Sequence, residues 1–291
     1  MIDAVAPPGG LVGGDVHLDL PSVGATENIL MAAVRARGET VIHNAAREPE
    51  IVDLARFLEA AGALIEGAGE SAVRVRGVNR LAGVRHAVMP DRIETGTLLL
   101  AGAATGGEVR VEGAAPAHLG ALADLLRASG AGVEVDGASI GVLGPEDGRP
   151  RPVDVRTLPY PGFPTDLQPV VMAYLARARG TSVVQETIFE NRFRHASAFV
   201  RMGARVRVVG RTAVVDGVAH LAGAAVEGGD LRAVAALVVA ALTADEPSDV
   251  GGLDHLERGY QDLDGRLRRL GAAIARGDGV RPLAEREVRV S

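Results

Sequence analysis

Hydrophobic residues follow a pattern that occurs four times along the chain. Each time, a segment with helical spacing of its apolar residues ends in Gly-Ala, and a stretch that alternates apolar and polar residues follows. The four glycines, spaced by roughly 70 residues, are Gly62, Gly130, Gly203 and Gly271. Glycine is common directly after a helix because it adopts the left-handed conformation without strain. The pattern predicts four related copies, with β-hairpins at Val133–Ile140 and Val206–Val215.

A second kind of helix is expected earlier in each copy. Its segments are apolar on nearly every side, and they are Ile29–Val34, Leu98–Ala104, Pro169–Ala178 and Val234–Ala244. A helix without a polar face belongs inside a core, whereas the alternating strands carry outward arginines such as Arg74 and Arg205. The sequence therefore predicts an α/β fold of repeated units with buried helices and sheets outside. A generic layered α/β fold is the alternative that this pattern leaves open.

The composition changes near Val88-Met89-Pro90, which predicts a domain boundary there. We expect residues 1–89 to belong to one domain and residues 90–291 to a second. The segment after Gly277 is rich in Arg and Gly, so it is expected to be partly loose.

The composition limits the catalytic groups, metal sites and partners that this chain can have. The 291 residues carry a net charge of −6 and include no cysteine, and all 31 basic residues are arginine. The sequence therefore excludes disulfides, thiolate metal sites and cysteine nucleophiles. It also excludes Schiff bases on lysine and phosphate-binding loops that use a lysine. A slightly acidic chain argues against a nucleic-acid partner, and no apolar run is long enough to cross a membrane. The start lacks a signal-peptide pattern, so we expect a cytoplasmic protein. The histidines lack ligand spacing and predict no metal site, although His195 and His255 could titrate near neutrality.

A polar or Pro/Gly-rich loop stands before each helix of the second kind. The four loops are Leu20–Glu27, Pro90–Thr97, Pro161–Asp166 and Gly228–Arg232. Helix N-termini present free N–H groups and a partial positive charge, so several of them in one cleft would bind a multiply anionic ligand. Helix capping by Thr26, Thr95, Thr165 and Asp230 explains each single loop equally well.

Three arginines and one aspartate lie near these loops or near short helical segments. Arg192, Arg232 and Arg258 could each present a planar fork to a carboxylate or a phosphate. Asp166 could act as a general base toward a sugar hydroxyl, or it could simply complement the helix dipole. From the residues alone, the chain is a repeat protein that could bind a small anionic ligand.

Six motifs span almost the whole chain and occur in the order of one known family. They are Ser22–Thr26, Asn44–Asp53, Pro90–Gly96, Phe163–Asp166, Phe189–Phe193 and Arg258–Tyr260. On these motifs the chain resembles the UDP-N-acetylglucosamine 1-carboxyvinyltransferases, which are enolpyruvyl transferases. The resemblance implies an inside-out α/β barrel of six similar units in two domains, about four of which this sequence carries. It also implies transfer of the enolpyruvyl group from phosphoenolpyruvate to the 3-hydroxyl of UDP-N-acetylglucosamine, the first committed step of peptidoglycan precursor synthesis. No metal or organic cofactor is implied.

The resemblance assigns the site residues as well. Those implied at UDP-N-acetylglucosamine are Leu20, Pro21, Ser22, Val23, Asp166 and Ile188, with Asp166 as the base and Ile188 acting through its backbone. Those implied at phosphoenolpyruvate are Arg192, Asp230, Arg232 and Arg258. Some family members have a basic residue where Leu20 stands.

The family's N-terminal third has no counterpart in this sequence, including its Lys-Asn pair, further arginines and the mobile loop with the catalytic acid, a Cys or Asp. The resemblance therefore predicts that this chain alone binds its substrates poorly and turns over little or not at all. It also predicts that the missing units leave faces of the apolar helices exposed. Two alternatives remain open: a non-catalytic paralogue that binds a nucleotide sugar, and a chain that needs a separate N-terminal partner.

Overall fold

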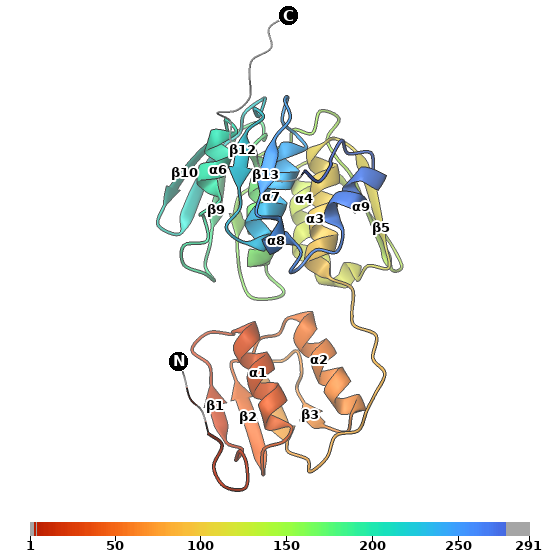
Figure 1. The fold of residues 1–291 in the computed structure, drawn as a ribbon, viewed down its shortest axis with the longest axis vertical. Coiled ribbons are helices and arrows are strands. Elements are labelled where there is room, and N and C mark those ends of the chain that lie inside the picture. The colour runs from red at the N-terminus through yellow and green to blue at the C-terminus, as the bar shows by residue number, and fades with distance from the viewer. Residues whose placement is uncertain (1–2, 4, 278–291) are drawn as a thin grey trace, which may run out of the picture. The chain divides into compact units, whose positions relative to one another are not determined.

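The chain forms two compact units, shown in the computed structural model in Figure 1. The structure describes residue 3 and residues 5–277. Unit 1 comprises the chain up to Met89 together with Pro159–Pro161, and unit 2 comprises Pro90–Leu158 and the chain from Gly162 onward. Within unit 1, the N–H of Tyr160 donates a 3.2 Å hydrogen bond to Glu48 Oε1. Each unit is described separately below.

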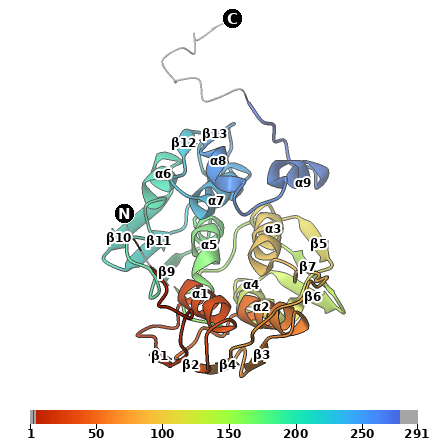
Figure 2. The ribbon, with the colours of Figure 1, turned by 60° about the horizontal axis from the view of Figure 1, so that its bottom comes forward.

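Unit 1 contains one four-stranded sheet with two helices on one of its faces (Figure 2). Its elements are β1 (Asp15–His17), α1 (Val23–Ala33), β2 (Glu39–His43), α2 (Pro49–Ala60), β3 (Leu64–Glu66) and β4 (Ala72–Arg76). The strand order is β1-β2-β4-β3, with β1 parallel to β2 and the other pairs antiparallel. Alternation places Val73 and Val75 of β4 in the core, where they pack in one cluster with Leu30 of α1 and Leu58 of α2.

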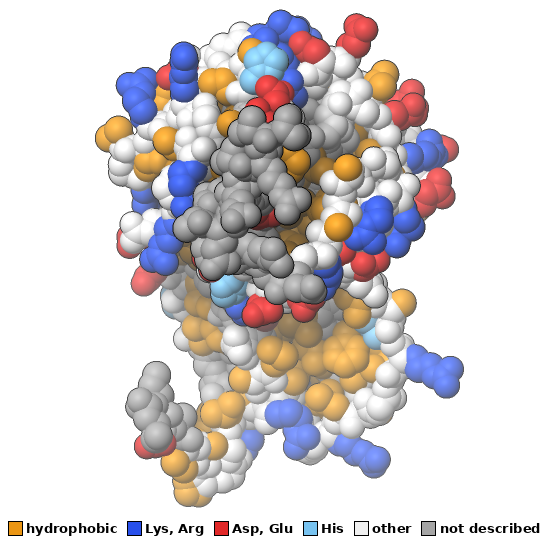
Figure 3. All heavy atoms as spheres, turned by 45° about the horizontal axis from the view of Figure 1, so that its top comes forward, with side chains coloured by type: hydrophobic (Ala, Val, Ile, Leu, Met, Phe, Trp, Pro, Cys, Tyr) orange, Lys and Arg blue, Asp and Glu red, His pale blue; other side chains and the backbone are white. Residues whose placement is uncertain are grey.

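Helix α1 corrects the expectation of a fully buried helix over Ile29–Val34. Leu30, Ala33 and Val34 are buried, but the side chain of Met31 is 47% exposed. The sequence prediction is wrong here because an apolar helix becomes buried only where neighbours cover each side, and within unit 1 the helix packs on the sheet and α2 alone. Figure 3 shows hydrophobic side chains gathered on the face of unit 1 that is visible in this view.

Unit 2 places its sheets around a group of central helices. Its strands are β5 (Glu108–Glu112), β6 (Gly132–Asp136), β7 (Ser139–Leu143), β8 (Val155–Arg156), β9 (Thr181–Gln185), β10 (Arg205–Val209), β11 (Thr212–Asp216), β12 (Ala225–Glu227) and β13 (Asp249–Gly251). They form sheets of order β5-β7-β6, β10-β11-β9-β8 and β12-β13. The antiparallel pairs β6–β7 and β10–β11 confirm the two hairpins predicted from the alternating pattern.

The helices of unit 2 are of the two kinds that the sequence predicts. They are α3 (Arg92–Ala104), α4 (Gly120–Ala128), α5 (Gln168–Leu175), α6 (Ala196–Arg201), α7 (Leu231–Ala241), α8 (Leu253–Leu256) and α9 (Leu263–Arg269), with 3-10 turns at Pro116–Leu119 and Thr165–Leu167. None of the described helices is long and apolar enough to cross a membrane.

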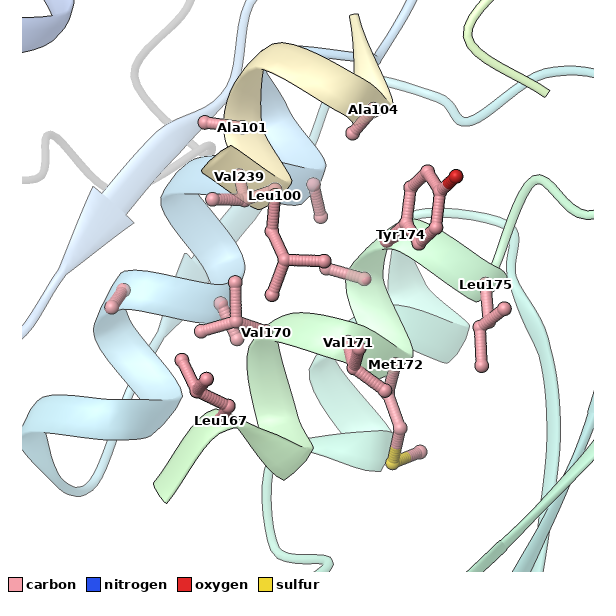
Figure 4. Close-up of a cluster of buried hydrophobic side chains, with 14 of the residues drawn as sticks. Leu100, Ala101, Ala104, Leu167, Val170, Val171, Met172, Tyr174, Leu175 and Val239 are labelled. Carbon is pink, nitrogen blue, oxygen red and sulfur yellow. The ribbon is translucent and has the colours of Figure 1, made fainter. Parts of the chain in front are cut away.

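Helices α3, α5 and α7 pack on one another at the centre of unit 2. Every residue of α5 is buried, and Leu100 of α3 and Val239 of α7 lie in the same cluster (Figure 4). A helix that is apolar on every side is stable only where neighbours cover each side, and the other two helices and the surrounding sheets do so here. The predicted arrangement of buried helices with sheets outside is confirmed in this unit.

The four Gly-Ala pairs end helices α2, α4, α6 and α9 in the same way. All four glycines have positive φ, between 84° and 104°. In each case the N–H of the following alanine donates to a carbonyl five residues earlier, as Ala63 does to Leu58 at 2.9 Å and Ala204 to Phe199 at 3.0 Å. This is the Schellman arrangement, which satisfies carbonyl groups that the helix end leaves free. The predicted helix ends are confirmed.

The difference in burial between α3 and α1 predicts a difference in stability. Leu100→Ala should lower the free energy of unfolding of unit 2 by about 2–5 kcal/mol, because it removes a fully buried side chain and leaves a cavity. Met31→Ala, on the exposed side of α1, should cost less than about 1 kcal/mol. Urea unfolding followed by circular dichroism measures both, and equal effects would show that the two helices are equally packed in solution.

Candidate functional site

The N-terminal ends of the three central helices meet in unit 2. Asp166 lies in the 3-10 turn directly before α5, and Asp230 is the N-cap of α7. Asp230 Oδ1 accepts hydrogen bonds from the N–H groups of Arg232 and Ala233, at 2.9 and 3.0 Å, which fixes the start of α7. Thr97 of α3 joins this group because its Oγ1 lies 3.0 Å from the hydroxyl of Tyr260, and the ring of Tyr260 contacts Arg232. The loops before α5 and α7 therefore lie side by side, as the resemblance implies.

Asp166 connects two arginines that are distant from it in sequence. Its Oδ1 accepts a hydrogen bond from Arg192 Nη2 at 2.6 Å, and its Oδ2 accepts one from Arg232 Nη2 at 2.8 Å. The side chains of Arg192 and Arg232 are only 19% and 13% exposed. Water therefore screens these ion pairs less than it screens surface pairs. The structure brings together three of the site residues implied by the resemblance.

Arg232 has a second contact on the ring of Tyr260. Its Cζ atom lies 5.5 Å from the ring centroid, and the Tyr260 hydroxyl lies 3.0 Å from Thr97 Oγ1. Burial opposes the charge of Arg232, but Asp166 and Tyr260 outweigh this effect and raise the pKa of the guanidinium. Burial also raises the pKa of the Tyr260 hydroxyl. Arg232 is thus a fixed positive charge that the neutral Tyr260 helps to hold.

Several donors of the two arginines are not used by the protein. Arg192 Nε and both Arg232 Nε and Nη1 are buried and have no hydrogen-bond partner among the described residues. A buried donor without a partner costs about 1–3 kcal/mol, and such groups commonly mark the place of a water or a ligand. Guanidinium donors match the oxygens of a phosphate or carboxylate, so this part of the site suits an oxyanion.

Two of the remaining expected site residues are not joined to Asp166 directly. Arg258 follows α8, and its side chain is exposed, with no hydrogen bond or ion pair to Asp166 in the part of the chain that the structure describes. Ile188 follows β9, and its N–H donates to Glu186 Oε1 at 2.8 Å. The roles assigned to these two residues remain predictions.

The uridine-side residues belong to unit 1. Leu20, Pro21, Ser22 and Val23 form the start of α1, where Ser22 is the N-cap and its Oγ accepts a 3.3 Å hydrogen bond from the Ala25 N–H. Leu20 is exposed. The structure therefore explains Ser22 by helix capping, and its role toward a nucleotide remains a prediction.

The burial of two ionisable residues near the site was not predicted from the sequence pattern. Glu186, directly after β9, is 1% exposed. His195 is buried at the start of α6, where its ring packs edge-on against Phe199. Burial lowers the pKa of His195 from 6.5 to about 4, with Asp230 opposing this effect and Arg192 adding to it. The expectation that His195 titrates near neutrality is therefore wrong. In the sequence, only the nearby aromatic residues Phe193 and Phe199 could have indicated that the ring of His195 is buried.

Known proteins share both the sequence and the fold. A family model described as EPSP synthase (3-phosphoshikimate 1-carboxyvinyltransferase) matches residues 4–267. The chain belongs to this enolpyruvyl transferase family. A similar relative is UDP-N-acetylglucosamine 1-carboxyvinyltransferase 2 of Carboxydothermus hydrogenoformans, 53% identical over 94% of this chain and 65% of its own length. UDP-N-acetylglucosamine 1-carboxyvinyltransferase 1 of Staphylococcus aureus strain bovine RF122 is 52% identical over 92% of this chain and 63% of its own length.

Solved structures of the enolpyruvyl transferase family agree with this fold. The enolpyruvyl transferase NikO from Streptomyces tendae is 30% identical, with a TM-score of 0.78 over 87% of this chain and 60% of that one. An EPSP synthase from Acinetobacter baumannii, 19% identical with a TM-score of 0.66, shows the common fold. The resemblance inferred from the motifs is confirmed, and the chain spans less than two thirds of the length of these relatives.

Among the described residues, no group of three His, Asp or Glu side chains is arranged to hold a metal ion. The charged groups that the structure brings together at the site are those of Asp166, Asp230, Arg192 and Arg232.

The burial of neutral His195 predicts a pH dependence of stability. The unfolded state binds a proton at this ring below about pH 6.5, whereas the folded state resists protonation down to about pH 4. The stabilisation is therefore complete above pH 6.5 and is lost as the pH falls from 6.5 toward 4. Between pH 7 and pH 5 this ring alone should remove about 2 kcal/mol from the free energy of unfolding.

Urea unfolding of the wild type and of His195→Gln at both pH values tests this prediction. The variant should lose about 2 kcal/mol less than the wild type on acidification. His220→Gln, which replaces an exposed histidine, serves as the control and should keep the wild-type difference. An unchanged pH dependence in His195→Gln would contradict the prediction.

Proposed function

We propose that this chain contributes to the transfer of the enolpyruvyl group of phosphoenolpyruvate to the 3-hydroxyl of UDP-N-acetylglucosamine. This is the first committed step of peptidoglycan precursor synthesis, and on its substrates we place it in the cytoplasm. The observation that carries the proposal is the pairing of Asp166 with two buried arginines that keep unused donors. This arrangement provides a carboxylate and an oxyanion-binding group within one site.

The arginines are suited to phosphoenolpyruvate. Arg232 and Arg192 keep buried N–H groups for the oxygens of its phosphate or carboxylate. Fixed guanidinium groups would also stabilise the negative charge that the phosphate gains as it leaves. Asp230 holds the start of α7 and thereby the backbone of Arg232. Arg258 is proposed as a further phosphoenolpyruvate ligand on the resemblance alone.

Asp166 is the proposed base for the sugar hydroxyl. Both of its carboxylate oxygens accept hydrogen bonds from arginines in this structure. Each oxygen keeps a second lone pair that can accept the proton of the 3-hydroxyl, and a bound oxyanion that takes over guanidinium donors would leave more of the charge of Asp166 to that proton. In this proposal the proton moves to Asp166 as the sugar oxygen bonds to the enolpyruvyl carbon, and the bond from that carbon to the phosphate oxygen breaks as inorganic phosphate leaves.

The nucleotide sugar would lie along two loops, one before α5 and one after β9. Because the N–H of Ile188 is donated to Glu186, a backbone contact from Ile188 to a ligand has to use its carbonyl oxygen. The ligand must then supply a donor, such as an N-acetyl N–H or a sugar hydroxyl. Leu20, Pro21, Ser22 and Val23 are proposed for the uridine end, on the resemblance.

The choice of acceptor substrate can be tested directly. The relatives that are 52–53% identical are named for UDP-N-acetylglucosamine, whereas the EPSP synthase structure is 19% identical. We expect UDP-N-acetylglucosamine to bind the purified chain in isothermal titration calorimetry and 3-phosphoshikimate not to bind. Any phosphate release with phosphoenolpyruvate should likewise be greater with UDP-N-acetylglucosamine than with 3-phosphoshikimate. Binding of 3-phosphoshikimate, or no binding of UDP-N-acetylglucosamine, would contradict the proposal.

The role of Arg232 predicts a loss of affinity for the anionic substrate. Arg232→Gln removes the charge but keeps hydrogen-bonding capacity, so phosphoenolpyruvate should bind at least about tenfold more weakly in the presence of UDP-N-acetylglucosamine. Titration calorimetry measures the affinity. Arg205→Gln, on the exposed face of β10, is the matched control and should bind as the wild type does. An equal affinity of Arg232→Gln and the control would exclude Arg232 from the site.

A further inference from the structure

Glu186 is a buried carboxylate that collects four hydrogen-bond donors. Its Oε1 accepts from Thr157 Oγ1 at 2.9 Å, from the Ile188 N–H at 2.8 Å and from the Phe189 N–H at 3.1 Å. Its Oε2 accepts from Thr165 Oγ1 at 2.9 Å. The two backbone N–H groups can only donate and the two threonine hydroxyls can donate as well, so all four partners can satisfy an ionised carboxylate at once.

The four donors come from the segments that carry the site. Thr165 directly precedes Asp166, and Ile188 is the residue proposed to contact the nucleotide sugar. Thr157 directly follows β8, and it is also joined to the loop after β9, because its Oγ1 accepts a 2.8 Å hydrogen bond from the Thr187 N–H. A single side chain therefore ties the loop before α5 to the loop after β9, and both to the end of β8. Charge-assisted bonds of this kind are about twice as strong as neutral ones.

The corresponding connection in unit 1 contains no charge. There Asn44 follows β2 as Glu186 follows β9, and its Nδ2 donates a 2.9 Å hydrogen bond to the carbonyl of Leu18, just after β1. The backbone also matches, because the Leu18 N–H donates to His43 and the Thr157 N–H donates to Gln185. A neutral amide is thus sufficient for this connection in the repeat. Burying a carboxylate is costly, so the charge in unit 2 calls for a reason beyond the fold.

We propose that Glu186 is a positioning residue of the site, whose ionised carboxylate holds the loop of Asp166 and the Ile188 peptide in the geometry that receives the nucleotide sugar. The part of this inference that concerns the ligand rests on the proposed function. Glu186 itself acts through Thr165 and Ile188. Its neutral analogue, glutamine, can supply one acceptor oxygen only, so its NH2 group would lie at Thr165 Oγ1, whose hydroxyl would have to accept where it now donates.

Hydrogen exchange of the ligand-free chain tests the positioning role without any substrate. In Glu186→Gln, the amides of Phe163, of residues 165–167 and of residues 187–189 should exchange at least about tenfold faster than in the wild type. Thr165→Val removes one donor only, so it should accelerate Phe163 and residues 165–167 and leave residues 187–189 protected. Glu190→Gln is the matched control, because Glu190 is an exposed residue of the same loop that pairs with Arg211. Unchanged exchange in Glu186→Gln, or faster exchange throughout the chain, would overturn the inference.

Ligand affinity then separates positioning of the site from a purely structural role. Glu186→Gln should weaken the binding of UDP-N-acetylglucosamine by about tenfold and change the affinity for phosphoenolpyruvate by less than about twofold. The reason is that the hydrogen-bond partners of Glu186 lie on the side of the site proposed for the sugar. If the wild type binds UDP-N-acetylglucosamine and Glu186→Gln binds it equally well, the inference is wrong. If the wild type does not bind it, the proposed function fails, and the exchange data alone decide whether Glu186 positions the two loops.

Discussion

The burial of three helices without a polar face determines the architecture of unit 2. Helices α3, α5 and α7 cannot present any side to water at low cost, so they pack on one another and the sheets lie outside them. Helices packed in this way bring their N-terminal ends together. Loops that are about 65 residues apart in sequence, such as those of Asp166 and Arg232, thereby become neighbours. The site is a consequence of this packing, since no short motif contains its members.

The same constraint explains why two arginines can be held nearly buried. Removing a guanidinium from water is unfavourable unless charge and hydrogen bonds replace the solvent. Asp166 provides that replacement for both Arg192 and Arg232, and Tyr260 supports the second. One carboxylate does not use all of the donors of two guanidinium groups, and the excess positive charge and free N–H groups remain available. Removing Asp166 would leave two nearly buried guanidinium groups without their ion-pair partner.

The local structure could be predicted from the sequence because it depends on neighbouring residues. The Gly-Ala pairs gave the helix ends, since only the residue at the left-handed position and the one after it matter. The alternation from Val133 to Ile140 predicted a hairpin for the same reason. Burial of α1 could not be predicted in this way. Its sequence resembles that of the central helices, but the exposure of Met31 depends on which elements surround the helix.

The site was predictable in part only. Arg192, Arg232 and Asp166 were selected because they lie close to helix starts and match family motifs, and the structure joins them. Glu186 gave no such signal, because a glutamate after a strand is usually solvated, and its burial follows from donors up to 29 residues away. His195 likewise looks like an ordinary titrating histidine until the packing of Phe199 is known.

Asp166 also has a different role with and without an anion in the site. Without one, its two oxygens neutralise Arg192 and Arg232, and the carboxylate is occupied. An incoming oxyanion finds the unused donors first, and each bond that it forms weakens the hold of the arginines on Asp166. In the proposed function, this weakening would leave more of the charge of Asp166 to accept the proton of the sugar hydroxyl. The ion pairs of Asp166 would thus make its strength as a base depend on the bound anion.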